Sequence, residues 1–365
     1  MPPNDFRILI SPLDWGLGHS TRCIAIIRQL LEAGYKITIA GSGRSLLLLQ
    51  KEFPLIESIE IQSFSPSYPP SGKMLLHLLL LLPKFISSIF NEHQQLKKIL
   101  LTNRFDVVIS DNRYGFWNPD VKSILITHQI MIKAPAWLRF AEFLFYILSR
   151  LMISRFDECW IPDNETKPGL SGDLSHKYTL PGNTRFIGPL TRFTGKIKYL
   201  GNVSGKPKIT VIISGPEPQR SIFEDLIINQ LIKLNITATI VSGKPDFEKP
   251  AFINNGLTII PHLETSALES VIASSDLIIC RSGYSSIMDL SVFGSKVLFV
   301  PTPGQTEQLY LAKLHQNSGT ALWRPQDKLN LETDIQEALK YKGFKMDTAI
   351  SPFDASILYP LKSKS

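Results

Sequence analysis

The 365-residue sequence predicts an α/β protein made of two halves, each with a parallel β-sheet wound by helices. Short apolar runs alternate with longer stretches of helical spacing, which is the pattern of strand–helix–strand units. Each half starts with an apolar run followed by a glycine-bearing loop, at Arg7–Ser11 and at Lys208–Ile213. Between the halves, residues 194–206 are rich in lysine and glycine and have no strong period, which indicates a domain boundary.

The chain therefore divides into a first domain, 1–193, and a second domain, 207–346. The last residues, 347–365, contain proline and lysine and little period. We expect this tail to pack back on the first domain. No close sequence repeat relates the two halves.

The composition is that of a globular protein with a sizeable core, since 44% of the residues are hydrophobic and 19% are charged. A net charge of +7 suits anionic substrates or an anionic membrane surface and does not argue for nucleic acid. Three widely spaced cysteines, Cys23, Cys159 and Cys280, give no disulfide or zinc pattern, so a reducing cytoplasm is expected. The N-terminal residues do not have the pattern of a signal peptide, and no uninterrupted apolar run reaches 18 residues, so we expect no transmembrane helix.

The first half contains six apolar runs typical of strands in a parallel sheet. They are Arg7–Ser11, Lys36–Ala40, Ile56–Ile61, Asp106–Ser110, Ser123–Thr127 and Glu158–Pro162. Helical spacing follows the first run at Cys23–Leu31, and Gly41-Ser42-Gly43 starts the next helix.

Two further stretches of the first half are unusually apolar. Met74–Ile86 has a proline inside it and is too short to cross a bilayer. It is either a buried helix or an exposed apolar patch that dips into a membrane. Ala136–Phe156 mixes aromatic and leucine residues with Arg139, Arg150 and Arg155. This pattern fits a membrane surface, and snorkelling arginines on an ordinary surface helix explain it as well.

Polar residues follow three strands of the first half, beginning at Asp111-Asn112, His128 and Asp163. The carboxyl ends of parallel strands lie at one edge of a sheet, where open α/β sheets bind ligands, so we expect one shared cleft. For each single residue, capping of the following segment is the alternative.

The second half repeats this organisation. Its predicted strands are Lys208–Ile213, Thr237–Ser242, Leu257–Pro261, Leu277–Cys280 and Lys296–Val300. Helical spacing is found at Ser221–Leu234 and Tyr284–Phe293.

Two loops at strand ends of the second half are the clearest candidates for a ligand site. One contains Ser214 and Gly215, and the other contains Ser282, Gly283 and Ser285. Backbone N–H groups of such loops, supported by a helix dipole, suit a diphosphate.

Charged residues near these loops extend the predicted site. Arg220 and Arg281 are expected to add charge-assisted bonds to the diphosphate. Asp289 is placed to take both ribose hydroxyls, unless it is a solvated helix residue. Glu307 and Gln308 are placed to hold sugar hydroxyls, unless Glu307 only complements the helix dipole.

The first half offers a base. His19 follows Gly16 and Gly18 at a helix start and is the best general-base candidate, with a capping or structural histidine as the alternative. The seven histidines show no HxH or HExxH spacing and no Asp-x-Asp occurs, so no metal site is expected. A nucleophile elbow and a P-loop are absent from the sequence.

These motifs resemble the metal-independent GT-B glycosyltransferases of the family 28 type. That group includes the peptidoglycan-precursor N-acetylglucosaminyltransferase and the plant monogalactosyldiacylglycerol synthases, and the chain looks most like uncharacterised bacterial glycosyltransferase-like proteins. The likeness is most specific from about Lys208 to Gly319. There Arg281-Ser282-Gly283, Asp289, Pro301 and Glu307-Gln308 match the donor-nucleotide signature in order and spacing. Gly16-x-Gly18-His19 after the first strand supports it.

The resemblance implies two Rossmann-like domains whose parallel sheets face each other across a cleft. It implies that the second domain binds a nucleotide-diphosphate sugar, usually a uridine one, and that the first binds the acceptor, often a lipid. The implied donor site consists of Ser214, Gly215, Arg220, His262, Leu263, Arg281, Ser282, Gly283, Tyr284, Ser285, Asp289, Glu307 and Gln308. The implied acceptor loop consists of Gly16, Gly18, Asn112 and His128.

The family has a glutamate where this chain has Asp289, and its first phosphate loop is richer in glycine. Pro216 and Pro218 remove two N–H donors from that loop, and Arg220 is expected to compensate.

The predicted reaction is an inverting transfer of a hexose or N-acetylhexosamine from a nucleotide-diphosphate sugar, UDP in the first instance, to a hydroxyl of a lipid-linked or other glycan acceptor. His19, or with less support Asp111, is the base, and neither metal nor cofactor is required. A cytoplasmic protein is expected, peripheral on the inner face of the membrane through 74–86 and 136–156, with no nucleic-acid partner.

Two other classes stay open. A UDP-N-acetylglucosamine 2-epimerase-like enzyme would share this fold and donor site and would need no acceptor. A non-catalytic relative would bind the sugar nucleotide without turning it over. The sugar, the acceptor and the identity of the base are left open by the sequence.

Overall fold

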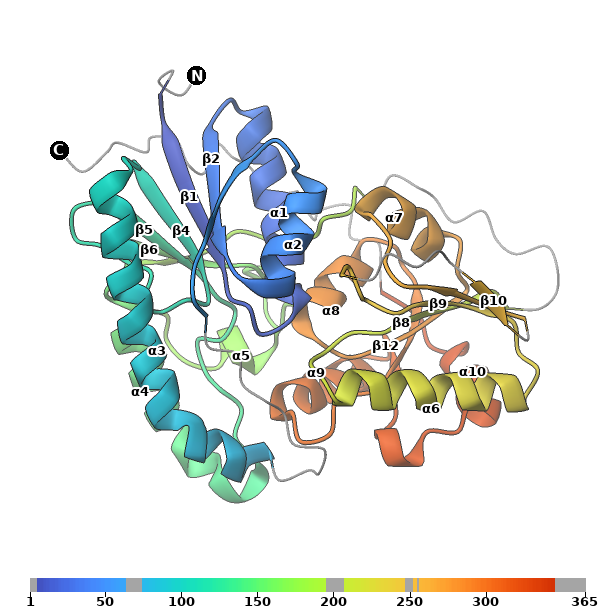
Figure 1. Cartoon of the computed structure of the whole chain (residues 1–365). Coiled ribbons are helices and arrows are strands. Elements are labelled where there is room, and N and C mark those ends of the chain that lie inside the picture. The colour runs from blue at the N-terminus through green and yellow to red at the C-terminus, as the bar shows by residue number, and fades with distance from the viewer. Residues whose placement is uncertain (1–4, 64–73, 195–206, 247–251, 255, 345–365) are drawn as a thin grey trace. The chain divides into compact units, whose positions relative to one another are not determined.

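The structure is a computed structural model that describes residues 5–63, 74–194, 207–246, 252–254 and 256–344, with only the backbone described for 74–82, 136 and 252–254. Contacts divide the described chain into two compact units (Figure 1). Unit 1 contains residues 5–63 and 78–192, and unit 2 contains residues 193–344 together with 74–77, the first residues of a helix that otherwise belongs to unit 1. The predicted C-terminal tail, 347–365, lies outside the described residues.

Unit 1 alternates strands and helices. Its strands are β1 (Arg7–Pro12), β2 (Lys36–Gly41), β3 (Glu57–Glu60), β4 (Val107–Asp111), β5 (Lys122–Ile126), β6 (Glu158–Ile161) and β7 (Thr184–Phe186). Its helices are α1 (Leu17–Glu32), α2 (Gly43–Glu52), α3 (Met74–Thr102), the 3-10 helix η1 (Ala136–Ala141), α4 (Glu142–Ile153) and α5 (Asp173–His176).

The seven strands of unit 1 form one parallel sheet in the order β3-β2-β1-β4-β5-β6-β7. This is the doubly wound order: β1 to β3 are added toward one edge of the sheet, and β4 to β7 are added toward the other. The switch point lies between the parallel neighbours β1 and β4. The two strands are in register at their carboxyl ends, where Pro12 pairs with Asp111. The β1 and β4 loops therefore leave the sheet side by side, and ligands bind at such switch points.

Helices cover both faces of this sheet, with α1 and α2 on one side and α3 and α4 on the other (Figure 1). Leu9 and Val108 of the sheet pack with Leu96 and Ile99 of α3. On the same face, Leu125 and Cys159 pack with Tyr146 and Ile153 of α4. The strands read as nearly continuous apolar runs because they are buried on both faces.

Unit 2 has the same plan. Its strands are β8 (Ile209–Ile212), β9 (Ala238–Val241), β10 (Phe252–Asn254), β11 (Leu257–Ile260), β12 (Leu277–Cys280), β13 (Lys296–Phe299) and β14 (Leu322–Trp323). Its helices are α6 (Gln219–Lys233), α7 (Thr265–Ala273), α8 (Tyr284–Ser291), α9 (Thr306–Asn317), the 3-10 helix η2 (Gln326–Lys328) and α10 (Leu331–Ala338).

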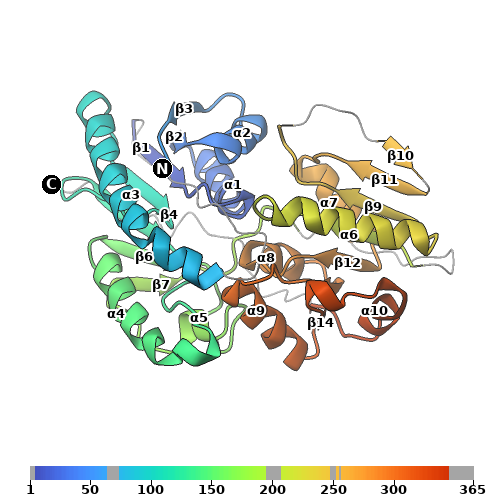
Figure 2. The ribbon, with the colours of Figure 1, turned by 60° about the horizontal axis from the view of Figure 1, so that its bottom comes forward.

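The sheet of unit 2 has the order β10-β11-β9-β8-β12-β13-β14 and is parallel except for the edge strand β10. Its switch point lies between β8 and β12, where Ile212 pairs with Cys280. Helices α6 and α10 pack on one face through Phe223, Ile227 and Ile335 (Figure 2). The loop after β8 and the loop after β12, the two predicted phosphate loops, are thus neighbours at one edge.

The α/β fold class predicted from the sequence is confirmed, and the predicted strands differ from the observed ones by one or two residues at most of their ends. Two helices are longer than the segments named from the sequence. The helix that contains Cys23–Leu31 begins at Leu17, and the apolar segment Met74–Ile86 continues as α3 through Pro83 to Thr102. Proline is tolerated there with its neighbours still helical, because the amphipathic stretch beyond it packs on the sheet. None of the helices in the described part of the chain is long and apolar enough to cross a membrane.

Candidate active site

The switch point of unit 1 brings together His19 and Asp111, which are 92 positions apart in the chain. Asp111 is the last residue of β4. His19 lies in the first turn of α1, which begins after Gly16. Gly16 has φ of 133°, a conformation that favours glycine, and a side chain there would meet no atom within 4 Å. The helix start is therefore open on the Gly16 side.

The imidazole Nδ1 of His19 lies 2.8 Å from Oδ1 of Asp111. Asp111 is fully buried, whereas 19% of the His19 side chain is exposed. A buried carboxylate that holds Nδ1 of a partly exposed histidine leaves Nε2 to act on a substrate, which is the arrangement of a carboxylate-oriented general base.

Arg22 completes the cluster, and the sequence analysis missed it. Its Nε and Nη2 donate to the two carboxylate oxygens of Asp111. Its Nη2 also lies 2.8 Å from Nδ1 of His19, and its Nη1 lies 3.4 Å from Nδ1 of His128. The signal was the three-residue spacing of His19 and Arg22, which places both on one face of a helix.

Burial and charge set the protonation of the pair. Burial lowers the pKa of His19; Asp111 opposes this effect, and the positive charge of Arg22 adds to it. Burial by itself would raise the pKa of Asp111, but Arg22 and His19 outweigh it and hold that pKa well below its ordinary value. At neutral pH the cluster therefore combines a neutral imidazole with an ionised carboxylate, which are the forms that a general base requires.

The other residues predicted for the acceptor side lie at the same edge. Asn112 follows Asp111 with φ of 55°, is buried, and its Oδ1 has no hydrogen-bond partner among the described residues. His128 follows β5 and is buried against Arg22. Gly18 lies in the first turn of α1, where its carbonyl accepts from Thr21.

The polar cluster after β6 is occupied by its own loop. Both carboxylate oxygens of Asp163 accept backbone N–H bonds, from Leu170 at 2.7 Å and from Ser171 at 2.9 Å. The Ser171 hydroxyl donates to Asp163 as well, at 2.5 Å. In the described part of the chain, the side-chain bonds of Asp163 go to its own loop and to His176, and none goes to His19 or Asp111. The expectation that all three strand-end clusters share one cleft therefore finds support for only two of them.

In unit 2 the loop after β12 and the loop after β13 are tied together. The Ser282 hydroxyl donates to the carbonyl of Gln308 at 2.8 Å, and the Thr302 N–H donates to Oε1 of Gln308 at 2.8 Å. Gly283 is the N-cap of α8, and a side chain there would meet no atom within 4 Å. Open space thus lies beside the positive end of a helix, which suits a phosphate group.

Arg281 is buried beside this space and is held by backbone carbonyls. Its Nη1 donates to Val300 at 3.0 Å and to Pro301 at 3.2 Å, and its Nη2 donates to Gln219 at 3.0 Å. The guanidinium lies over the ring of Phe223, 4.0 Å from its centroid. Burial lowers the pKa of Arg281 to about 9. No carboxylate of the described residues forms an ion pair with it, so its charge is not neutralised.

Arg220, at the start of α6, has a different environment from the one predicted. Its guanidinium pairs with Glu217 and Glu224 and donates to the Ser242 carbonyl at 3.1 Å. Two carboxylates therefore neutralise the charge of Arg220. A direct bond from Arg220 to a diphosphate would require these pairs to open.

The remaining predicted donor residues lie at the same edge of the sheet of unit 2. Ser214 and Gly215 follow β8, and Gly215 has φ of 108° and is exposed. His262 and Leu263 follow β11 and are half-buried. Tyr284, Ser285 and Asp289 lie on α8, and Glu307 and Gln308 lie in the first turn of α9. Asp289 is buried, so the alternative of a solvated helix residue is wrong. Their roles as ligands stay predictions.

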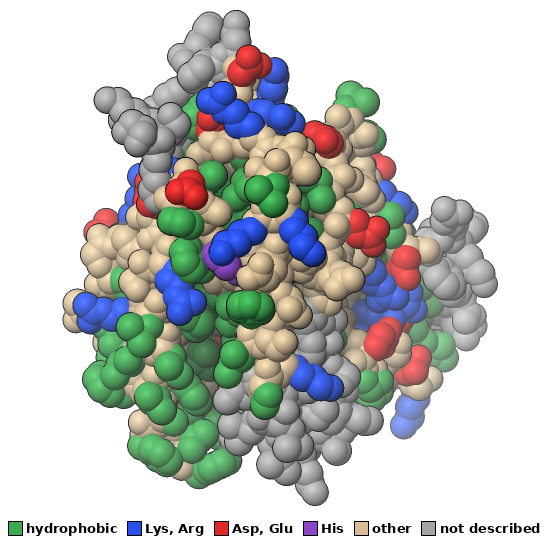
Figure 3. Space-filling model, turned by 60° about the vertical axis from the view of Figure 1, so that its left-hand side comes forward, with side chains coloured by type: hydrophobic (Ala, Val, Ile, Leu, Met, Phe, Trp, Pro, Cys, Tyr) green, Lys and Arg blue, Asp and Glu red, His purple; other side chains and the backbone are tan. Residues whose placement is uncertain are grey.

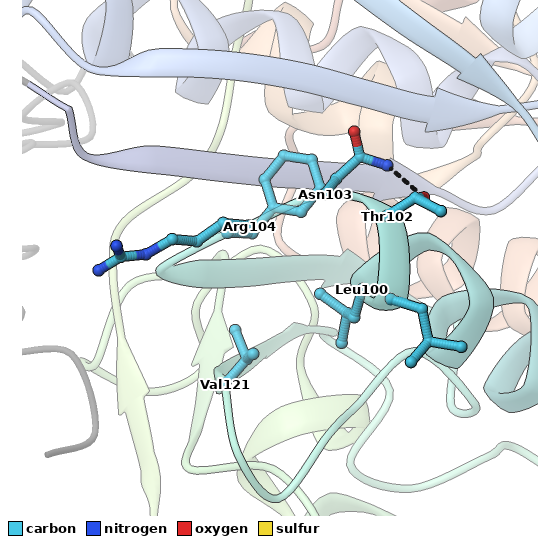
Figure 4. A pocket seen from close by; sticks show the side chains of 7 residues that line it. Leu100, Thr102, Asn103, Arg104 and Val121 are labelled. Atoms are coloured by element: carbon cyan, nitrogen blue, oxygen red, sulfur yellow. Dashed lines mark hydrogen bonds between the residues drawn. The ribbon is translucent and has the colours of Figure 1, made fainter.

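The hollow drawn in Figure 4 has a volume of about 350 Å³ and is lined by Leu100–Phe105 and Val121. These residues precede β4 and β5, at the edge of the sheet opposite to Asp111. It contains none of the predicted site residues. Within the described ranges, no three His, Cys, Asp or Glu side chains form a group that could hold a metal ion.

Comparisons with known proteins agree with this arrangement. Residues 225–353 match the sequence model of the glycosyltransferase family 28 C-terminal domain. An uncharacterised glycosyltransferase of Methanosarcina acetivorans is 25% identical over 340 residues, covering 86% of this chain and 84% of the relative. The UDP-N-acetylglucosamine–N-acetylmuramyl-(pentapeptide) pyrophosphoryl-undecaprenol N-acetylglucosamine transferase of Sulfurihydrogenibium is 24% identical, covering 82% of this chain and 77% of the relative.

Solved structures show the same fold. The glycotransferase of kitacinnamycin superposes with a TM-score of 0.61 at 14% identity, over 98% of this chain and 94% of its own. MurG of Acinetobacter baumannii superposes with a TM-score of 0.54 at 14% identity, over 97% of this chain and 98% of its own. The resemblance predicted from Arg281-Ser282-Gly283 and the residues after it is confirmed.

Proposed function

We propose that this glycosyltransferase, whose residues 225–353 match the family 28 C-terminal domain, moves a hexose or N-acetylhexosamine from a nucleotide-diphosphate sugar to an acceptor hydroxyl with inversion. UDP is the proposed nucleotide, because the Sulfurihydrogenibium relative is named for UDP-N-acetylglucosamine. In this proposal unit 2 holds the donor and unit 1 supplies the base. The observation that carries it is the 2.8 Å contact between His19 Nδ1 and Asp111 Oδ1 at a switch point.

The proposed donor site is the edge formed by the loops after β8 and β12. The diphosphate lies in the open space at Gly283, against the first N–H groups of α8. The unneutralised charge of Arg281 adds a favourable potential there without direct contact, since its N–H groups already bond to carbonyls. Asp289 and Gln308 take the ribose and sugar hydroxyls.

In the proposed reaction Nε2 of His19 accepts the proton of the acceptor hydroxyl. The oxygen attacks the anomeric carbon and forms the new glycosidic bond. The bond between that carbon and the diphosphate oxygen breaks, and the nucleotide diphosphate leaves with the electron pair. Asp111 stabilises the imidazolium that forms, and the amides of α8 stabilise the charge on the leaving diphosphate. We expect no metal ion or other cofactor to be required.

The proposed acceptor is lipid-linked. The Sulfurihydrogenibium relative is named for a pyrophosphoryl-undecaprenol acceptor. In this chain, Trp15 directly precedes Gly16 and contacts Phe85 of α3, with ring centroids 5.7 Å apart. The apolar helix α3 therefore reaches the loop that leads to His19. Ile86 and Phe90, farther along α3, are exposed.

We also propose that η1 and α4 rest on an anionic bilayer. The apolar side chains exposed here, called the α4 face, are Trp137, Phe140, Phe143, Leu144, Ile147, Leu148 and Leu151. Figure 3 shows hydrophobic side chains gathered on the lower part of this side of the molecule. Arg139, Arg150 and Arg155 are exposed in the same segment, whereas its acid, Glu142, is buried against Lys177 at 2.6 Å. Apolar residues with cations but no exposed acid fit the interface of an anionic membrane.

Transfer is tested by incubating wild type and H19A with a panel of sugar nucleotides and with short-chain polyprenyl-phosphate glycans, followed by product analysis. Wild-type transfer with an inverted anomeric centre, lost in H19A, supports the proposal. An epimer formed from the sugar nucleotide alone would favour the epimerase alternative. Donor binding by calorimetry without turnover on any acceptor would favour the non-catalytic one.

Membrane contact is tested by flotation with vesicles of phosphatidylglycerol and with neutral vesicles. Wild type should float with the anionic vesicles, and F140E/L144E should float at least about tenfold less, because two charges in the α4 face oppose burial. Ile222 on α6 is also an exposed apolar residue, so I222E is the matched control and should float as wild type does. Equal flotation of all three proteins, or a dimer that dissociates in F140E/L144E, would contradict the membrane assignment.

A further inference from the structure

Two charged side chains of unit 1 lie within hydrogen-bond distance of the same nitrogen, Nδ1 of His19. Nδ1 of His19 lies 2.8 Å from Oδ1 of Asp111 and 2.8 Å from Nη2 of Arg22. The same Nη2 donates to Oδ1 of Asp111, so the three atoms form a closed triangle. Asp111 and Arg22 are both fully buried, which fixes the two groups that His19 faces.

The triangle allows two hydrogen-bond arrangements, and they exclude each other. A carboxylate only accepts, so the contact with Asp111 requires a proton on Nδ1. A guanidinium only donates, so the contact with Arg22 requires a lone pair on Nδ1. In a neutral imidazole the first arrangement leaves Nε2 unprotonated and able to accept a proton, and the second places the proton on Nε2.

We propose that Arg22 is a positioning residue of this enzyme, which competes with Asp111 for Nδ1 of His19 and so controls when Nε2 is able to act as a base. The proposal rests on the proposed function of His19. The acceptor hydroxyl donates to Nε2, and this bond is made only when Nδ1 donates to Asp111. Acceptor binding thus selects the reactive tautomer, and Arg22 stabilises the unreactive one.

The groups around His19 come from three elements. Asp111 belongs to β4, Arg22 and Cys23 belong to α1, and His128 follows β5. The Cys23 thiol donates to Asp111 at 3.7 Å, and burial raises its pKa well above the ordinary value, so it adds no charge. Arg22 and His128 both lower the pKa of His19, and Asp111 raises it. Removal of Arg22 therefore leaves Asp111 as the dominant charge and favours the imidazolium.

A purely structural role for Arg22 would need only its two bonds to Asp111. The additional contacts of Nη2 with His19 and of Nη1 with His128 link the ion pair to the imidazole that carries the reaction. A structural role for Arg22 and a role in controlling His19 have different consequences for the pH dependence of activity. A structural loss lowers activity equally at every pH, whereas a loss of control over His19 changes the pH profile.

The first experiment reads the ring nitrogens of His19 by NMR, with 15N-histidine labelling and assignment by H19Q. It uses wild type, R22K and R22M without substrate. Among the neutral forms of the ring, observed at a pH above its titration, we expect both tautomers in wild type and the Nδ1–H tautomer alone in R22M. R22K should be intermediate, because an ammonium cannot bond like the fork of a guanidinium. Two results would overturn the proposal: a His19 ring that is wholly Nδ1–H in wild type, or a tautomer ratio that is the same in wild type and R22K. Both results can be read even if no transfer activity is found.

The second experiment measures kcat/KM for the acceptor from pH 5.5 to 9. Loss of a neighbouring positive charge should move the acidic limb of R22M to higher pH, with about tenfold lower kcat/KM at pH 6 and no loss at pH 9. R22K should lie between R22M and wild type. A uniform loss at all pH values in both variants would show a structural role and would overturn the proposal.

Arg28 provides the matched control on the same helix. It pairs with Glu52 at 2.6 Å and donates to the carbonyl of Arg192 at 3.0 Å, away from His19. R28M should keep the wild-type tautomer ratio and pH profile. A shift in R28M equal to that in R22M would assign the effect to the overall charge and would also overturn the proposal.

Discussion

Arg22 and Arg281 are both buried at the carboxyl edge of a parallel sheet, one in each unit, and their bonding differs. Arg22 bonds to the carboxylate of Asp111, and Arg281 bonds to the carbonyls of Gln219, Val300 and Pro301. The charge of Arg22 is neutralised by Asp111, whereas Arg281 forms no ion pair with any residue that the structure describes. Burial of a cation without a counter-charge is unfavourable in free energy, and an anionic ligand at the same edge would offset this unfavourable term.

In the proposed reaction, this difference lets two sheets of similar topology serve different chemistry. In unit 1 the paired charges create a local environment for proton transfer, with a neutral imidazole beside an ionised carboxylate. In unit 2 the open helix N-terminus at Gly283 and the unpaired guanidinium create a positive potential that favours a diphosphate. Topology supplies the location, and the bonding of one arginine in each unit sets the charge there.

The largest effect is expected from Asp111→Asn, which would make Arg22 a cation without a carboxylate, like Arg281. The asparagine no longer orients His19 as a carboxylate does, so kcat should fall about a thousandfold. The buried guanidinium is left unpaired, so the free energy of unfolding should fall by about 3–5 kcal/mol. Transfer assays and urea denaturation measure the two effects. Full activity in Asp111→Asn would contradict the proposal that the carboxylate of Asp111 orients His19.

A smaller effect is expected from Arg281→Met, which removes the unneutralised cation from unit 2. Calorimetry should show that UDP binds about tenfold to a hundredfold more weakly. Arg324 of unit 2 pairs with Asp334 at 2.7 Å and with Glu337, so Arg324→Met is the control and should bind UDP as wild type does. Equal losses in the two variants would mean that the net charge of the unit, and not Arg281, governs binding.

Gly283→Ala should weaken UDP binding about tenfold while the free energy of unfolding changes by less than about 1 kcal/mol. The new methyl group meets no protein atom within 4 Å and enters only the space assigned to the diphosphate. Gly115→Ala in unit 1 is the contrast, because its Cβ would lie 2.1 Å from the Ile89 carbonyl oxygen, so this variant should lose stability. Unchanged UDP affinity in Gly283→Ala would place the diphosphate elsewhere.

The smallest effect concerns pH and His19. Its pKa is lowered in the folded state, so the unfolded chain binds the proton more readily. The stability that His19 contributes is therefore present above its unfolded pKa of about 6.5 and is lost as pH falls below that value. His19→Gln should remove this loss, with a difference of less than about 1 kcal/mol at pH 5 in urea denaturation. An identical pH dependence in both proteins would contradict the lowered pKa.

Most strands follow from local sequence, whereas the two switch points follow from the strand order of the folded sheets. The run Leu277–Cys280 is apolar on both faces, is followed by the glycine-bearing loop Arg281-Ser282-Gly283, and is predicted to the residue. The short elements were missed: β7, β10 and β14 have two or three residues, and α7 and α10 have nine and eight. Such elements form because neighbouring strands and helices pack on them, and single-segment patterns do not contain that information.

Among the candidate site residues, local patterns identified those that lie in glycine-bearing loops. They did not identify Arg22, whose role depends on a residue 89 positions away. They gave Arg220 and Arg281 the same role, although two carboxylates neutralise Arg220 and only carbonyls hold Arg281. Residue type and spacing show that a charge is present, but its partners come from distant segments.

The sequence by itself determined two parallel α/β units, a donor-type signature in the second, and a histidine at the first helix start of unit 1. The tertiary structure alone decided that His19 faces a buried carboxylate and an arginine at once, and that Arg281 has no counter-charge among the described residues. The reason is physical. Hydrophobic periodicity is local and fixes the strands and helices, whereas the protonation of a side chain depends on burial and on charges within a few ångströms, which only the folded chain brings together.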